Sequence, residues 1–163
     1  IPNPFPYGNI DPVKNGSIEM IPTNTIITMQ FGSPLIVGGH AGYDLVYYEL
    51  PQGANPGVLM DRVQLQIGDG RNWYTIFNWG DGLADTNTNI PVPLRPPNPT
   101  NCAGEPDNCE IDASLMYDLS GVSIELDGVV PNGTYYYIRI ISPAAPLLDS
   151  GDGVEVDAIL VLP

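Results

Sequence analysis

Basic side chains are scarce in this chain. Its 163 residues include five Lys and Arg against nineteen Asp and Glu, which gives a formal net charge of −14. Phosphate backbones and anionic membranes are bound through basic patches, so this balance argues against nucleic acid and anionic lipid as partners. We expect a soluble exported protein, or one that neutralises part of its charge with bound cations.

Helical periodicity and long apolar runs are also missing. No segment of about a dozen residues keeps apolar residues at helical spacing without a Pro or Gly between them. There is no run of about eighteen apolar residues that could cross a membrane, no signal peptide and no initiator Met. The sequence is therefore interpreted as a piece of a longer secreted or cell-surface protein, without membrane insertion.

Glycine and proline, by contrast, are abundant, with 18 of each, while 43% of the residues are hydrophobic. Short strands joined by Gly and Pro turns have this composition, whereas disordered chains lack the apolar residues. Segments rich in β-branched and aromatic residues predict an antiparallel β-sandwich or jelly roll of about 8–10 strands. The predicted strands cover residues 17–21, 25–31, 43–50, 62–67, 71–79, 121–126, 135–142 and 154–162.

The organisation is that of one domain with a lead-in and a long loop. Residues 1–16 are Pro-rich and predict an extended lead-in, residues 17–163 form the domain, and residues 80–110 are an irregular insertion. Gly68-Asp69-Gly70 predicts a tight hairpin between two alternating runs. Because the same tripeptide recurs at 80–82 and 151–153, it is interpreted as a turn device and not as a metal motif.

The last predicted strand carries two carboxylates in an otherwise apolar sequence. Strict alternation would place Val154, Val156, Ala158, Leu160 and Leu162 on one face and Glu155, Asp157, Ile159 and Val161 on the other. A strand that is apolar on both faces is usually buried on both, and a buried carboxylate needs a compensating partner. The chain has too few Lys and Arg to supply one for every acid, which favours a cation.

Four motifs resemble a known family: GGHAGYDLVYYE, VQLQIGDGRNWY, YYYIRIIS and GDGVEVDAILVL. They are similar to the galactose-binding-domain-like, discoidin-like jelly-roll modules of bacterial cell-surface and secreted proteins, over about residues 17–163 apart from the insertion. The resemblance implies an extracellular module that binds glycans or other surface macromolecules, acts in adhesion or is purely structural. It also implies a structural Ca²⁺ held by acids of the early and last strands, here Asp44, Glu49, Glu155 and Asp157.

A second candidate calcium segment lies in the insertion. Asp85, Asn87 and Asn89 have the D-x-N-x-N spacing that begins a calcium loop, and Asp81 precedes them, but the Gly and Glu that complete such a loop are absent. An Asx-rich turn, in which these side chains bind their own backbone, explains the segment equally well. The candidate ligands here are Asp81, Asp85 and Asn87.

Aromatic side chains are the candidate ligand-binding residues. Alternation would place Trp73, Thr75, Phe77 and Trp79 on one strand face, where exposed rings could stack on sugars. The run of three tyrosines at 135–137 must present rings to both faces, which adds Tyr136 to the candidates Trp73 and Trp79. The alternative is that these rings fill the core.

Enzymatic activity is not expected. His40 is the single histidine, no G-x-S-x-G nucleophile elbow occurs, and the nearest carboxylate pair lacks the polar cluster of a glycosidase. A structural subunit of a surface layer or filament, self-assembling through the lead-in or an open strand edge, is the main alternative to a binding module. A hydrolase is the third possibility.

Cys102 and Cys109, in CAGEPDNC, are predicted to form a small disulfide loop within the insertion, which implies an oxidising compartment. A half metal site is disfavoured because no second Cys or His pair completes it. The bond should stabilise its segment by about 2–3 kcal/mol. Thiol labelling of the native and unfolded protein should find no free cysteine, and two free thiols would refute the bond.

Overall fold

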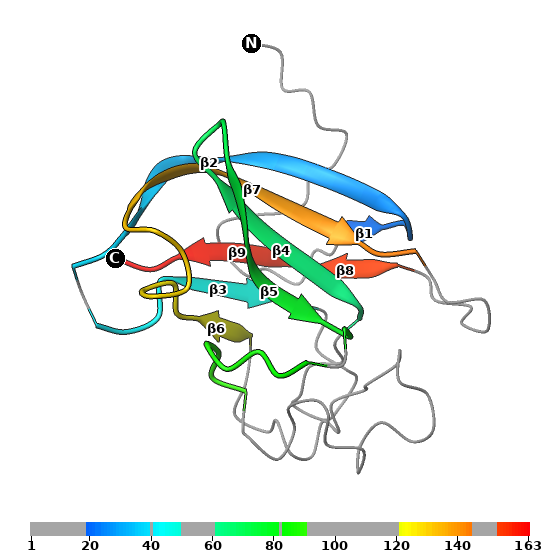
Figure 1. Ribbon diagram of the computed structural model, residues 1–163. Coiled ribbons are helices and arrows are strands. Elements are labelled where there is room, and N and C mark those ends of the chain that lie inside the picture. The colour runs from blue at the N-terminus through cyan, green and yellow to red at the C-terminus, as the bar shows by residue number, and fades with distance from the viewer. Residues whose placement is uncertain (1–18, 40, 50–60, 82, 91–120, 145–152) are drawn as a thin grey trace.

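The computed structural model describes residues 19–39, 41–49, 61–81, 83–90, 121–144 and 153–163. They form nine strands and no helix, all paired antiparallel (Figure 1), which confirms the all-β prediction for this part of the chain. None of the described segments is a helix with the length and hydropathy needed to span a bilayer. The lead-in, His40 and both cysteines lie outside the described residues.

The larger sheet has four strands in the order β2 (Thr25–Val37), β7 (Gly133–Ser142), β4 (Val63–Gly68) and β5 (Trp73–Trp79). The predicted hairpin at Gly68-Asp69-Gly70 is confirmed, since it joins β4 to β5. The Asp69 carboxylate stabilises this turn by accepting the N–H groups of Arg71 and Asn72 at 2.7 and 2.8 Å. An Asx turn of this kind fixes the register of a hairpin.

A second layer lies behind the larger sheet (Figure 1). It contains β6 (Val122–Ile124), β3 (Leu45–Tyr48) and β9 (Ala158–Val161), and β1 (Glu19–Ile21) pairs separately with β8 (Val154–Val156). One core fills the space between the layers, as in a β-sandwich. Tyr47 of β3 and Phe77 of β5 meet across it, with ring centroids 6.3 Å apart.

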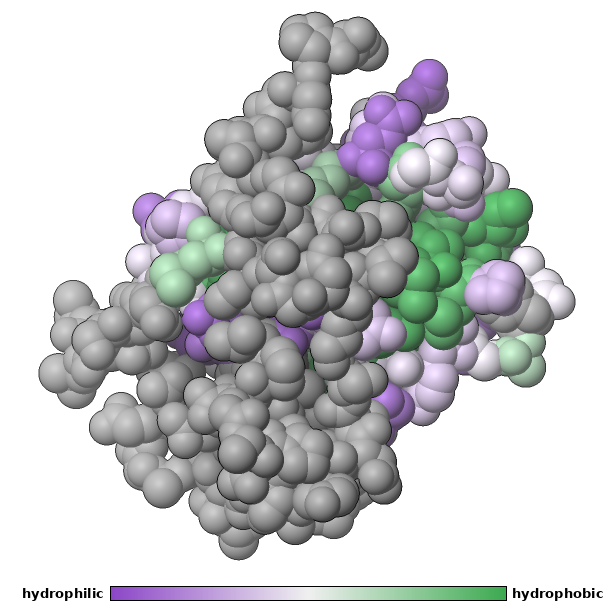
Figure 2. All heavy atoms as spheres, turned by 180° about the vertical axis from the view of Figure 1, so that it is seen from behind, coloured by the Kyte–Doolittle hydropathy of each residue, from purple (hydrophilic) through white to green (hydrophobic). Residues whose placement is uncertain are grey.

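The last predicted strand is broken at Asp157, which corrects the alternation expected for residues 154–162. Val154 and Val156 belong to the core, but so do Ile159 and, partly buried, Val161, so the inward-facing parity changes between the two segments. The change is possible because β8 pairs with β1 while β9 pairs with β3. Leu160 and Leu162 are left half-buried on the outer side, and Figure 2 shows apolar residues gathered on the side where β9 ends.

A bulge in β5 corrects the predicted row of aromatic side chains. Leu65 pairs with Phe77 and Gln66 with Thr75, so Ile76 is an extra residue in the ladder. Ile76, Phe77 and Trp79 are consequently all in the core, whereas Trp73 lies on the opposite, outer face with Thr75. The two tryptophans therefore do not share a face.

Gly153 precedes β8 and packs closely against the backbone at the end of β1. Its φ of +109° is strained for any residue with a side chain, and a Cβ there would collide with the backbone carbonyl oxygen of Ile21. We predict that Gly153→Ala lowers the free energy of unfolding by about 2 kcal/mol or more. Urea denaturation measures the effect. Gly32→Ala, at a position with nothing within 4 Å of the added Cβ, is the control and should be nearly neutral.

Candidate metal centre

Asp44 holds one end of the three-stranded sheet together. Its N–H donates to the carbonyl of Ile124 at 2.9 Å, and its carbonyl accepts the N–H of Leu162 at 2.8 Å, so β6 and β9 are both tied to the residue that precedes β3. The side chain is fully buried, and its Oδ2 accepts the Leu126 N–H at 2.7 Å. Its carboxylate is thus fixed in position by backbone contacts from a segment 82 residues away.

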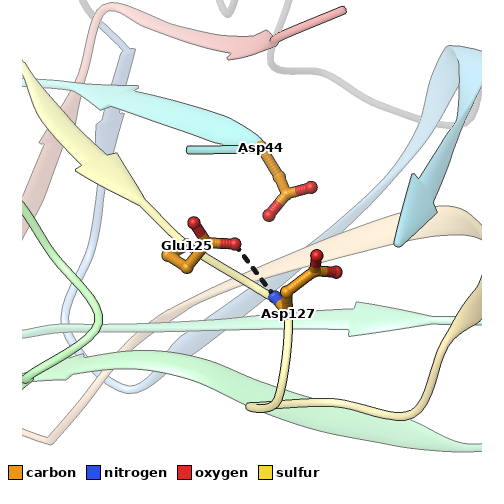
Figure 3. A group of neighbouring side chains, drawn as sticks. All are labelled: Asp44, Glu125 and Asp127. Carbon is orange, nitrogen blue, oxygen red and sulfur yellow. Dashed lines mark hydrogen bonds between the residues drawn. The ribbon is translucent and has the colours of Figure 1, made fainter. Parts of the chain in front are cut away.

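Glu125 and Asp127 bring two more carboxylates to the same place (Figure 3). They follow β6 and alternate with Leu126, whose side chain is buried. The two oxygens of Glu125 accept the N–H groups of Asp127 at 3.1 Å and Gly42 at 3.2 Å. These bonds orient the Glu125 side chain between the turn after β6 and the Gly-rich loop before β3.

The three carboxylates have the spacing of a cation site. One oxygen from each of Asp44, Glu125 and Asp127 lies within 4.8 Å of the others. Oxygens that share one Ca²⁺ at about 2.3–2.6 Å lie at most about 5 Å apart, so one ion can reach all three groups. Without a cation, carboxylates at this spacing repel each other by about 1–4 kcal/mol per pair, depending on their exposure to water.

Two further features fit a cation at this position. Oδ1 of Asp127 is buried and accepts no hydrogen bond from the described residues, which is costly for a carboxylate oxygen. An open depression of about 490 Å³ lies beside the cluster and is lined by Gly39, Ala41, Gly42 and the two half-buried acids. Water or a ligand oxygen could therefore complete the coordination shell from this side.

The acids predicted from the sequence are divided between the two ends of β3. Asp44 precedes the strand and Glu49 follows it, so about 16 Å of extended chain separates them. Only Asp44 belongs to the cluster; Asp157 is buried at the other end, where its N–H donates to the Tyr48 carbonyl at 3.0 Å. A single ion cannot take all four predicted ligands. Whether Glu49, Glu155 and Asp157 bind a separate ion stays a prediction.

Glu49 is buried in a second acidic environment, with 1% of its surface exposed. Its carboxylate accepts the Tyr47 hydroxyl at 2.7 Å and the Asp61 N–H at 3.2 Å. Burial, followed by the negative charge of Asp61, raises the pKa of Glu49 well above its ordinary value of 4.5, and Glu155 adds to the shift. Burial also raises the pKa of Tyr47, which stays a hydrogen-bond donor.

Side-chain hydrogen bonds hold the candidate calcium segment of the insertion in place. Asp81 accepts the Leu83 N–H at 2.7 Å and the Asn78 side-chain amide at 2.6 Å, and Asp85 accepts the Asn78 N–H at 3.0 Å. Asn87 donates to the carbonyls of Ile76 and Glu125 at 3.0 and 2.9 Å. The Asp81–Leu83 contact is local, as in an Asx turn, whereas the Asn87 amide clamps the backbone of Glu125 to β5. Whether Asp81, Asp85 and Asn87 bind an ion stays a prediction.

Of the three aromatic residues predicted to bind ligand, one lies in the core and two lie at the surface. Trp79 is 2% exposed and stacks on Phe77, so its ring is not available to a sugar; this corrects its assignment. Trp73 is half-buried on the outer face and Tyr136 is 42% exposed. Glycan binding through these two residues stays a prediction.

Sequence reasoning did not single out Glu125 and Asp127. The available signal was the E-L-D-G sequence at 125–128, in which two acids alternate at the end of a strand just before a glycine turn. The same pattern drew attention to Glu155 and Asp157. Only the pairing of β3 with β6 shows that Asp44 joins the earlier pair.

The buried Glu49 generates a pH prediction. A folded-state pKa above 4.5 means that its stabilising contribution is complete below the pKa of the unfolded chain and is lost as pH rises through the folded pKa. With chelator present, the unfolding free energy of the wild type should fall as pH rises, by up to about 1.4 kcal/mol per pH unit, and Glu49→Gln should remove this fall. The Gln side chain keeps an oxygen that can accept the Tyr47 hydroxyl.

Urea denaturation between pH 4.5 and 8.5 measures this slope. Asp61→Asn is the informative second variant, because loss of its charge should lower the Glu49 pKa and end the decline at a lower pH. Equal slopes for the wild type and Glu49→Gln would contradict the assignment.

No protein-family model, curated protein or solved structure matches this chain. The chemistry of the site is therefore inferred from the chain's own residues.

Proposed function

We propose that the chain is a non-catalytic, extracellular, Ca²⁺-binding β-sandwich module of a bacterial secreted or cell-surface protein, which binds glycans or other surface macromolecules. The calcium part of this proposal rests on one observation: carboxylate oxygens of Asp44, Glu125 and Asp127 lie within 4.8 Å of one another. The ion would join the loop before β3 to the turn after β6 and stabilise the sandwich at that end.

The ligand chemistry favours Ca²⁺ over other divalent ions. All three groups are carboxylates, which are hard oxygen ligands. The adjoining depression leaves room for water and backbone carbonyls, which suits the six to eight ligands of Ca²⁺. Mg²⁺ demands a tighter octahedral shell and loses its water reluctantly, so it is the weaker candidate.

The composition and the sequence motifs support an extracellular location for the module. A net charge of −14, the predicted Cys102–Cys109 disulfide and the turn-rich strands fit an exported protein. The discoidin-like jelly roll belongs to this proposal as the topology that the sequence motifs imply. A hydrolase is disfavoured because the sequence offers one histidine and no activated nucleophile motif.

The alternative is a structural subunit that assembles through a strand edge. β2 is an edge strand of the larger sheet, and Ile26 and Ile36 on it are 61% and 62% exposed. However, its register shifts between Gln30 and Leu35, where residues 31–34 bulge against β7. Bulges and prolines such as Pro34 protect edges from pairing with other chains, which favours the binding module.

Calcium should stabilise the fold measurably. A ligand that binds only the folded state contributes RT ln(1 + [L]/Kd), or about 2.7 kcal/mol at a hundredfold excess over Kd. For a chain of this size we expect EDTA to lower the melting temperature by several degrees. Differential scanning calorimetry with Ca²⁺ and with EDTA, together with elemental analysis of the purified protein, measures this effect.

Two matched substitutions locate the ion. Asp127→Asn should remove most of the sensitivity to chelator, whereas Asp157→Asn should leave it intact. The reverse result would place the ion at the last strand, as the sequence analysis expected. Identical melting with Ca²⁺ and EDTA, with no copurifying metal, would end the calcium proposal.

A further inference from the structure

Charge is distributed very unevenly between the two layers of the fold. The chain contains nineteen Asp and Glu residues, yet the four strands of the larger sheet, β2, β4, β5 and β7, contain none. Arg139 on β7 is the single charged residue in these strands. The larger sheet, which forms the front layer in Figure 1, is thus an almost uncharged surface on a strongly acidic protein.

Aromatic rings form a row on the outer face of this sheet. Gly68 of β4 pairs with both Trp73 and Tyr137, while its neighbour Ile67 points into the core, so the two rings lie outward. The ring centroids of Trp73 and Tyr137 are 6.4 Å apart. Tyr136 lies in the register shift against β2 and is 42% exposed, and its ring centroid is 6.4 Å from that of Tyr137, at the end of the row. The row therefore runs from β5 across β4 to β7.

Arg139 lies against this row. Its guanidinium carbon is 3.6 Å from the centroid of a Trp73 ring, and its Nε is buried without a hydrogen-bond partner among the described residues. Stacking holds the planar guanidinium in one orientation, so its N–H donors are pre-organised for a ligand. The four strands of the larger sheet contain no carboxylate that could pair with the Arg139 guanidinium.

Amide and hydroxyl groups complete the surface. Gln64 and Gln66 alternate with the core residue Leu65, and Gln66 donates to the Gln64 oxygen at 3.2 Å and to the Thr75 hydroxyl at 3.3 Å. Gln30 of β2 is exposed opposite Tyr137. These contacts form a connected polar network beside the aromatic row.

We propose that this outer face binds a neutral, hydroxyl-rich polysaccharide chain. Aromatic rings stack on the apolar faces of sugar rings, while planar amide and guanidinium groups exchange hydrogen bonds with hydroxyls. A net charge of −14 opposes acidic polysaccharides, but it does not oppose an uncharged one. The inference rests on the binding-module part of the proposed function and is independent of the cation, which would lie at the end of the other sheet.

Affinity electrophoresis of the folded protein tests the inference. The gels contain a β-glucan, a xylan, a galactomannan or an α-glucan as neutral probes, and alginate as the acidic probe. We expect at least one neutral polysaccharide to retard migration. Tyr136→Ala and Arg139→Gln should each weaken that retardation at least tenfold while preserving cooperative thermal melting.

Tyr43→Ala is the matched control, because Tyr43 is 41% exposed, close to the 42% of Tyr136, but precedes the three-stranded sheet. It should leave retardation unchanged, as should EDTA. If EDTA abolished binding while Tyr136→Ala and Arg139→Gln did not, the ligand would have to bind at the cation site, and the proposal would be overturned. Three other results would also overturn the proposal: no neutral polysaccharide retards the protein, only alginate retards it, or all three variants lose retardation equally. These results count against it whatever calorimetry shows for calcium.

Discussion

The structure is shaped by the need to bury carboxylates in a chain that has five basic side chains for nineteen acidic ones. Asp44, Glu49 and Asp157 are each 0–1% exposed, and charges of this kind are costly to bury unless they are paired or neutralised. All three lie at the ends of strands in the second layer, where free backbone N–H groups are available. Leu126 donates to Asp44, and Asp61 donates to Glu49. These buried acids all lie in the second layer, and the four strands of the larger sheet contain no Asp or Glu.

The candidate site depends on contacts between residues far apart in the sequence. Asp44 joins β6 and β9 through its backbone, and the Asn87 amide binds carbonyls of both β5 and the segment after β6. Residues 87–89 of the insertion therefore contribute to the sandwich. Asn89 accepts the Ser123 N–H at 2.8 Å, and Thr88 bridges to Ile124. The position of Glu125 is thus determined from both layers.

Sequence reasoning succeeded where the pattern was local. The β4–β5 hairpin was readable because Gly68-Asp69-Gly70 separates two β-rich runs, and each predicted strand overlaps an observed one, although β2 runs on to Val37 and the last predicted strand is two strands. It failed where pairing partners change. The partner strand changes at Asp157, and the register against β4 shifts at Ile76; alternation along a single strand encodes neither. Asp127 was missed for the same reason, since it becomes a candidate ligand only beside Asp44.

The unequal lengths of the ladders have a mechanical consequence. β1 is held to β8 by three residue pairs and β9 to β3 by four, whereas β2 is held to β7 by nine. Tension applied along the chain would reach the short terminal ladders first. β1 and β9 would then detach before the central sheet yields, releasing length in steps while the face that carries Trp73 and Arg139 stays assembled. A domain with this order of rupture would lengthen under tension before the outer face of its larger sheet is disrupted.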